Sequence, residues 1–234
     1  ERVPDGITPG FDANPGATWM DLAERHDQVA RGLRPTAASA ERALIQEARA
    51  RGLRDGRESM VVLDARNDRV VDWNRGDEDS VSMTGIMRDA ARDGRRNLTL
   101  VHNHPGGDTF TLSAPDFQVL QSLDGLETIV AVGHDGSIYR ATKQSTQFVI
   151  DGRRLNVENL AQLAFRLTLG ATENGQVDRA DLAEVHAFVV ARSLQQGGVI
   201  DYRHALSLRA SQLYARNRQV IEYLALRIAE RLVG

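Results

Sequence analysis

Two histidines near the middle of the chain have the type and spacing of metal ligands. His102 and His104 end the stretch NLTLVHNH, whose pattern predicts a strand. Because strand side chains point alternately to opposite faces, both imidazoles project to the same side. After a turn with Pro105 and two glycines, the helical pattern SAPDFQVLQSL brings Asp116 back towards the strand end. Two imidazoles and one carboxylate can hold Zn²⁺ and leave a fourth position for a water, whose pKa the ion lowers towards ~7.

Two further residues could complete a hydrolytic site. Glu58 begins the pattern ESMVVLDARNDRVVDW, a predicted strand that could pair with the strand of the histidines. A carboxylate there can accept a proton from the water and pass it to the leaving nitrogen. Ser113, one helical turn before Asp116, can direct its hydroxyl at the substrate carbonyl. Ser-x-x-Asp is also a helix N-cap signature, and the two interpretations are compatible.

The remaining acidic residues and histidines are weaker candidates. Glu78 competes for the role of base, but it lies in the polar stretch RGDEDS with no apolar strand to hold it. Asp108 is expected to solvate a loop. His134 is expected at a surface hairpin tip, and His186 and His204 fall in helical patterns that favour packing or exposure over metal binding.

Glu58, the run His102-Asn103-His104-Pro105, Ser113 and Asp116 together resemble the motif of the JAMM (MPN+, JAB) zinc metallopeptidases. Within that family, the wording HNHPGG is most similar to the bacterial RadC-like branch. The resemblance covers about residues 55–145. It implies one Zn²⁺ per chain, with His102, His104 and Asp116 as ligands. It also implies that Glu58 is the general base and that Ser113 stabilises the oxyanion. The family usually has seven residues between the second histidine and the serine, whereas this chain has eight, 105–112.

The resemblance implies a peptidase or isopeptidase acting on a protein or peptide, with a ubiquitin-like protein among the candidate substrates. The stretch GFDANPGATW near the start also resembles the closing segment of phage Mu F-like minor head proteins, which suggests a role in phage-protein processing. Fusions of such a peptidase also occur in toxin systems, so a toxin-associated role is a further expectation. The alternative is a non-catalytic MPN-like structural or interaction module of a phage or prophage assembly. The complete set of five residues favours the enzyme, because a scaffold does not require them all.

Composition argues against several other classes. The chain of 234 residues has 29 Lys+Arg, 32 Asp+Glu and a net charge of -3, so we expect no nucleic-acid partner, which also disfavours a DNA-associated RadC-like role. Without cysteines, a metal must be held by His, Asp or Glu. No apolar run approaches the ~20 residues of a membrane span and no signal peptide is present, so we expect a cytoplasmic or virion-associated protein. Because the sequence begins with Glu1, we expect a fragment of a longer protein.

The elements that position these residues fall into three predicted regions. Residues 1–36, rich in Gly and Pro, are expected to be a linker or tail of an upstream region. Residues 37–150 alternate strands and helices, which predicts an α/β (α+β) domain with a mixed sheet flanked by helices. The family resemblance implies that this domain is JAMM/MPN-like. Residues 151–234 show helical patterns without a strand, which predicts an all-helical subdomain ending in a long helix.

Within the central region, the patterns predict each element in turn. A helix over 37–54 is ended by Gly56, and a hairpin follows over 58–73. A helix over 81–94 leads to the histidine strand, 97–104, and then to the helix over 113–123. Two strands over 127–142 complete the region.

Overall fold

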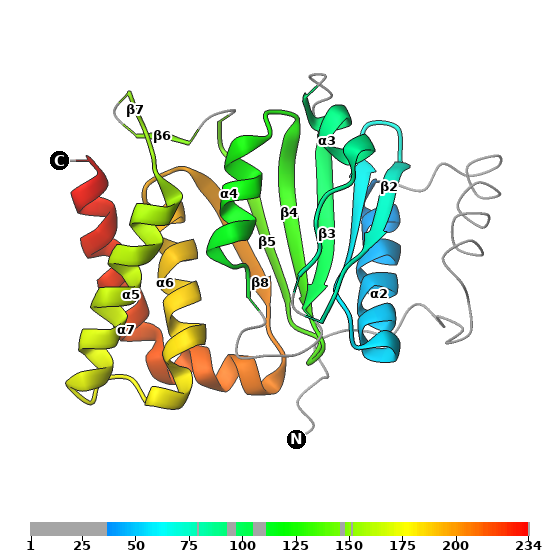
Figure 1. Ribbon diagram of the computed structural model, residues 1–234. Helices are drawn as coiled ribbons and strands as arrows, with labels where there is room; N and C mark the ends of the chain where they lie inside the picture. The colour runs from blue at the N-terminus through cyan, green and yellow to red at the C-terminus, as the bar shows by residue number, and fades with distance from the viewer. Residues whose placement is uncertain are drawn as a thin grey trace.

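The computed structural model describes residues 37–78, 80–92, 97–104, 111–145, 148–150 and 152–233. Within these residues, a six-stranded mixed sheet with the order β2-β1-β3-β4-β5-β8 is flanked by six helices (Figure 1). This architecture confirms the predicted α+β class. The tail predicted over residues 1–36 lies outside the described residues.

The elements up to residue 143 follow the predicted order closely: α2 (Ala37–Asp55), β1 (Ser59–Asp64), β2 (Arg69–Arg75), α3 (Gly85–Arg92), β3 (Leu98–His104), α4 (Ala114–Ser122), β4 (Leu126–Gly133) and β5 (Ile138–Lys143). The short strand β6 (Val149–Ile150) was not predicted. The remaining elements are β7 (Arg153–Arg154), α5 (Val157–Glu173), a 3₁₀ turn (Arg179–Asp181), α6 (Leu182–Gln196), β8 (Ile200–Ala205) and α7 (Leu208–Val233). The last helix is long, as predicted.

Strand β3 lies in the interior of the sheet, between β1 and β4. It pairs antiparallel with β1, placing Met60 opposite His102, and parallel with β4, placing Ala131 opposite His102. Parallel neighbours require a crossover connection, and α4 supplies it. The crossover brings the first turn of α4 to the end of β3 that carries the histidines.

Each face of the sheet is covered by a separate apolar layer. On one face, Leu44 and its neighbours in α2 pack against Val61, Val101 and Val130 of the central strands. The other face is covered by the remaining helices, which contribute Met87, Phe117, Leu160, Phe188 and Ile221. Alternation along β3 therefore directs even-numbered residues towards α4 and odd-numbered residues towards α2.

Strand β8 corrects the prediction that residues 151–234 contain helices only. Ile200 and Tyr202 are buried while Arg203 is exposed, and the strand pairs antiparallel with β5 at the edge of the sheet. Gly198 at φ +69° provides the turn after α6 that makes room for the strand. The six-residue segment was too short for its alternation to stand out between two helices, and His204 lies on this strand rather than on a helix.

Helix α3 begins four residues later than the predicted range 81–94. Thr84 stops the helix from extending backwards, because its hydroxyl donates to Asp72 Oδ2 and accepts from the Met87 amide, the bond of an N-cap. The Asn74 side-chain amide also donates to the Ser82 carbonyl, which holds the preceding residues against β2. A glycine cap at residue 94 lies outside the described residues.

We expect an ion pair between the 3₁₀ turn before α6 and helix α7, with a buried carboxylate and a half-exposed guanidinium, to affect stability in acid. Arg216 donates through two nitrogens to the Asp181 carboxylate, and Asn217 Nδ2 donates to Asp181 Oδ2 at 2.8 Å. The Arg216 hydrogen bonds lower the pKa of Asp181 from its ordinary 3.8, although burial opposes this. Asp181→Asn should reduce the free energy of unfolding at neutral pH by about 1–3 kcal/mol.

The sign of the pH dependence follows from the lowered pKa of Asp181. Its stabilising contribution is complete well above pH 3.8 and is lost as the pH falls through the lower pKa of the folded state. Urea unfolding of wild type and Asp181→Asn at several pH values should therefore give curves that converge in acid. Asp89→Asn, at an exposed position of α3, is the matched control. Parallel curves for Asp181→Asn and wild type would contradict the expectation.

Candidate metal centre

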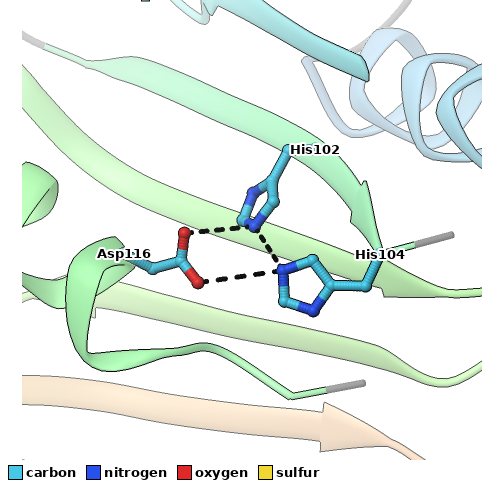
Figure 2. A group of neighbouring side chains, drawn as sticks. All are labelled: His102, His104 and Asp116. Carbon is cyan, nitrogen blue, oxygen red and sulfur yellow. Dashed lines mark hydrogen bonds and ion pairs between the residues drawn. The ribbon is translucent and has the colours of Figure 1, made fainter. Parts of the chain in front are cut away.

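His102 and His104 lie at the carboxyl end of β3 and share the face that α4 covers. Both residues are buried, and His102 is only 2% exposed. Their Nε2 atoms face each other at 2.9 Å (Figure 2). The strand alternation predicted from NLTLVHNH is confirmed, and it is what places the two imidazoles together.

The first turn of α4 supplies the third group. Ser113 is the N-cap, and its backbone N–H and its hydroxyl each donate to Asp116 Oδ2 at 2.7 Å. The Asp116 amide in turn lies 3.4 Å from Ser113 Oγ, which completes a capping box. The helix-cap interpretation of Ser-x-x-Asp is thus confirmed. Through the cap, Ser113 fixes the carboxylate that faces the histidines.

The three side chains converge from two elements on one point. Asp116 Oδ1 lies 3.1 Å from His102 Nε2, and Asp116 Oδ2 lies 3.9 Å from His104 Nε2 (Figure 2). One ligand atom from each residue lies within 4.8 Å of the other two. A buried His-His-Asp group of this kind can hold a metal ion.

The electrostatics of the group favour positive charge at its centre. Burial opposes ionisation of Asp116, but the two histidines and Ser113 outweigh it and hold the pKa of Asp116 far below its usual range. Burial likewise opposes a charged His102, yet the Asp116 carboxylate and, more weakly, Glu58 raise the pKa of His102. A carboxylate that stays ionised in a buried site is well suited to a cation.

Glu58 immediately precedes β1 and is 9% exposed. Because Met60 pairs with His102, and Glu58 is two residues before Met60, Glu58 falls on the same face of the sheet as the histidines. Its negative charge also contributes to the raised pKa of His102. The competing Glu78 is exposed. All five residues singled out in the sequence are therefore gathered in one region of the fold.

The other three histidines within the described ranges do not belong to this group. His186 on α6 contacts the Ala161 carbonyl at 3.1 Å, and His204 packs among Phe188, Tyr202 and Tyr214. His134 was predicted to lie on the surface, but at the β4–β5 turn it is half-buried. Asp108 and most of the long 105–112 connection lie outside the described residues.

Two contacts near the centre were not predicted. The Thr111 hydroxyl, next to the start of α4, lies 3.1 Å from the Tyr202 hydroxyl on β8. The side chain of Asn103, between the two histidines, points to the opposite face and bonds to the backbone beside Glu58. Both contacts join segments far apart in sequence, so local patterns carry no signal for them.

An open groove of about 470 Å³ is lined mainly by α5, with Ala161, Phe165 and Arg166 among its residues. Ala114, the residue after Ser113, also lines it, but none of the candidate ligands does. Phe165 is an exposed aromatic side chain. No family model matches the chain, and no curated protein or solved structure is significantly similar to it.

Proposed function

We propose that the protein is a zinc-dependent peptidase or isopeptidase. The observation that carries the proposal is the convergence of His102, His104 and Asp116 on one buried point, with Glu58 on the same face of the sheet. A metal site with three protein ligands and a nearby carboxylate is the arrangement that hydrolytic zinc enzymes use. A protein or peptide amide is the substrate class proposed.

The donor set fits zinc. Bonds of about 2.1 Å in a tetrahedral site put ligand atoms roughly 3.4 Å apart. The two imidazole Nε2 atoms are 2.9 Å apart, and Asp116 presents Oδ1 at 3.1 Å from His102 Nε2 and Oδ2 at 3.9 Å from His104 Nε2. One ligand atom from each residue lies within 4.8 Å of the other two, which is close to the size of a tetrahedral site. Two imidazoles with one carboxylate, and no thiolate, also match a zinc site that keeps one position open.

Each residue then has a definite role. A bound zinc ion would supply Lewis acidity, making water acidic enough to act as a nucleophile at neutral pH. His102, His104 and Asp116 would hold the ion, with Asp116 oriented by its hydrogen bonds from Ser113. Glu58 would take a proton from the water and deliver it to the leaving nitrogen. When substrate is present, the Ser113 hydroxyl would turn from Asp116 and donate its one proton to the developing oxyanion, while the Ser113 backbone N–H keeps its bond to Asp116.

Ser113 should affect both metal binding and hydrolysis. Ser113→Ala removes the hydroxyl bond to Asp116 Oδ2 but keeps the backbone bond to the same oxygen. We expect zinc affinity, measured by competition with a chelator, to fall ~10–100-fold, and kcat to fall with it. Ser122→Ala, at the exposed far end of α4, is the control. Unchanged zinc affinity in Ser113→Ala would show that the cap does not orient the ligand.

The proposal is tested by incubating the zinc-loaded protein with two substrates. A diverse peptide library, read by mass spectrometry, reports on ordinary peptide bonds, and lysine-linked ubiquitin chains report on isopeptide bonds. We expect cleavage of at least one of them, abolished by a zinc chelator and restored by added zinc. A protein that binds zinc but cleaves neither would favour the non-catalytic structural or interaction module over the enzyme.

A further inference from the structure

We propose that Asn103 is a positioning residue that holds Glu58 in place from the opposite face of the sheet. The inference rests on the proposed function, because it concerns how the general base of that site is fixed. Asn103 separates the two candidate ligands in sequence, but strand alternation sends its side chain away from the metal centre, towards α2. It therefore contributes through the backbone of a neighbouring segment.

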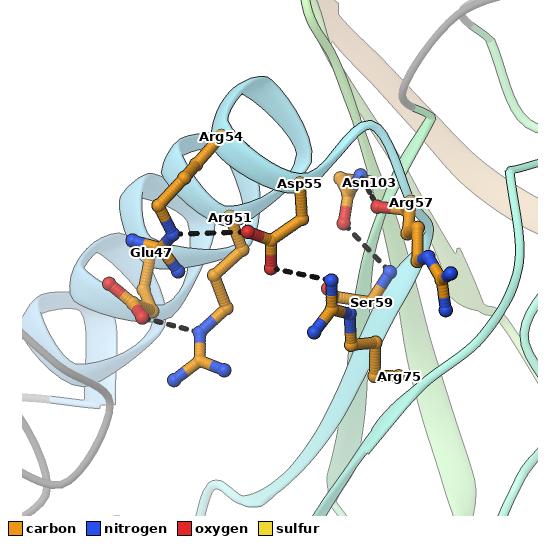
Figure 3. Close-up of polar contacts among 8 residues, drawn as sticks. All are labelled: Glu47, Arg51, Arg54, Asp55, Arg57, Ser59, Arg75 and Asn103. Atoms are coloured by element: carbon orange, nitrogen blue, oxygen red, sulfur yellow. Dashed lines mark hydrogen bonds and ion pairs between the residues drawn. The ribbon is translucent and has the colours of Figure 1, made fainter.

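The Asn103 amide bonds to both residues that flank Glu58. Its Oδ1 accepts from the Ser59 backbone N–H at 2.9 Å, and its Nδ2 donates to the Arg57 carbonyl at 3.1 Å (Figure 3). The two bonds hold the chain on each side of Glu58 to β3. A side-chain amide can donate and accept at once without carrying charge, because the two functions reside on separate atoms.

These bonds act where the regular sheet ends. The β1–β3 ladder runs from Asp64 opposite Leu98 to Met60 opposite His102, so Glu58 lies beyond the paired residues. On the side of β2, the Glu58 N–H donates to the Asp77 carbonyl at 2.7 Å, and the Glu58 carbonyl accepts from the Gly76 N–H at 2.9 Å. On the side of β3, the Asn103 side chain provides the connection that the backbone ladder no longer gives.

The Asn103 side chain is itself held rigidly. The residue is fully buried, and α2 packs over it at Gly52, where a Cβ would overlap with Asn103 Nδ2. Beside it, Asp55 at the end of α2 pairs with Arg75 of β2 at 3.3 Å (Figure 3). Asn103 thus has little freedom to move away from the Arg57–Ser59 backbone.

The geometry explains why an apolar residue would not serve between the histidines. A leucine at 103 would leave the buried Ser59 N–H without its acceptor and would remove the donor to the Arg57 carbonyl, which lies in a partly buried position. The cheapest relief is movement of the 57–59 backbone, which carries Glu58 with it. A displacement of about 1 Å at a catalytic group can cost ~100-fold in rate.

The test is Asn103→Ala in the zinc-loaded protein. We expect unchanged zinc content, an unchanged KM, and a kcat about tenfold to a hundredfold lower. In a Glu58→Gln background the same substitution should cause no further loss of kcat, because its effect acts through Glu58. Asn103→Asp keeps the acceptor for the Ser59 N–H and loses the donor, so it should recover part of the rate. It also serves as the second variant if Asn103→Ala does not fold.

Thr99→Val is the matched control. Thr99 is a buried polar residue on the same strand and the same face as Asn103, but it pairs with Leu63, far from Glu58. It should change stability without changing kcat. Amide hydrogen exchange gives a readout that does not depend on activity: the Ser59 amide should exchange faster in Asn103→Ala, while the Val61 and Leu63 amides keep their protection.

The outcomes separate this inference from the proposed function. If wild type is active and Asn103→Ala retains wild-type kcat, the inference is wrong and the proposed function stands. An equal further loss of kcat in the Glu58→Gln background, or unchanged exchange at Ser59, also overturns it. If wild type binds no zinc and cleaves nothing, the proposed function fails and the inference fails with it.

Discussion

Replacing Glu58 with glutamine is expected to abolish hydrolysis and leave zinc binding intact. The substitution keeps the size of the side chain but removes the carboxylate that would take the proton from water. Loss of a general base lowers kcat by ~10²–10⁴-fold. Because Glu58 is not among the three converging ligands, zinc content should stay at the wild-type level. Steady-state kinetics on a cleaved peptide, with elemental analysis of the same preparation, measures both quantities.

The Glu58 experiment has a direct control in Glu78→Gln. Glu78 is the competing carboxylate from the sequence, and it is exposed. Its replacement should leave kcat and zinc content unchanged. If Glu78→Gln loses activity and Glu58→Gln retains it, the general base is Glu78 and the assignment to Glu58 is wrong. Zinc loss in Glu58→Gln would instead make Glu58 part of the metal site.

Removing either His102 or Asp116 should abolish tight zinc binding. Each is one of the three candidate ligands, and the remaining two would not form a stable zinc site with an open position. Zinc that binds only the folded wild type should raise its melting temperature, because binding stabilises by RT ln(1 + [L]/Kd). We expect this zinc-dependent rise to vanish in His102→Ala and in Asp116→Ala, measured by thermal unfolding with zinc and with chelator.

His186→Ala is the control for the ligand variants. His186 is a half-buried histidine on α6 that bonds to the Ala161 carbonyl, so its loss should lower stability without changing the response to zinc. Retention of the zinc-dependent rise in both ligand variants would place the metal elsewhere. An equal loss in His186→Ala would show that the measurement reports general damage to the fold.

The candidate centre could be predicted from sequence because its geometry is local. His102 and His104 face together by the alternation of a strand, and Asp116 turns towards them by the hydrogen bonds of a helix cap. Glu58 depends on a longer inference, the pairing of two strands, but its hairpin pattern is strong and Glu78 lacks a strand to support it. These are patterns in which neighbours along the chain determine direction.

The parts that could not be predicted depend on contacts between distant segments. Strand β8 forms because the edge of β5 is available to pair, which is a property of the folded sheet rather than of residues 200–205 alone. The Thr111–Tyr202 contact joins residues that are 91 positions apart in the sequence. The Asn103 bonds beside Glu58 span 44 and 46 positions. Tertiary pairing overrides the local signal in each case.

Elemental analysis of the purified wild-type protein tests the central claim most directly. After exhaustive dialysis against metal-free buffer, the account predicts about one zinc per chain, and close to none in His102→Ala purified in parallel. The same preparations should be folded, as judged by circular dichroism. A folded wild type that takes up no zinc, or a His102→Ala variant that retains the full wild-type content, would contradict the account.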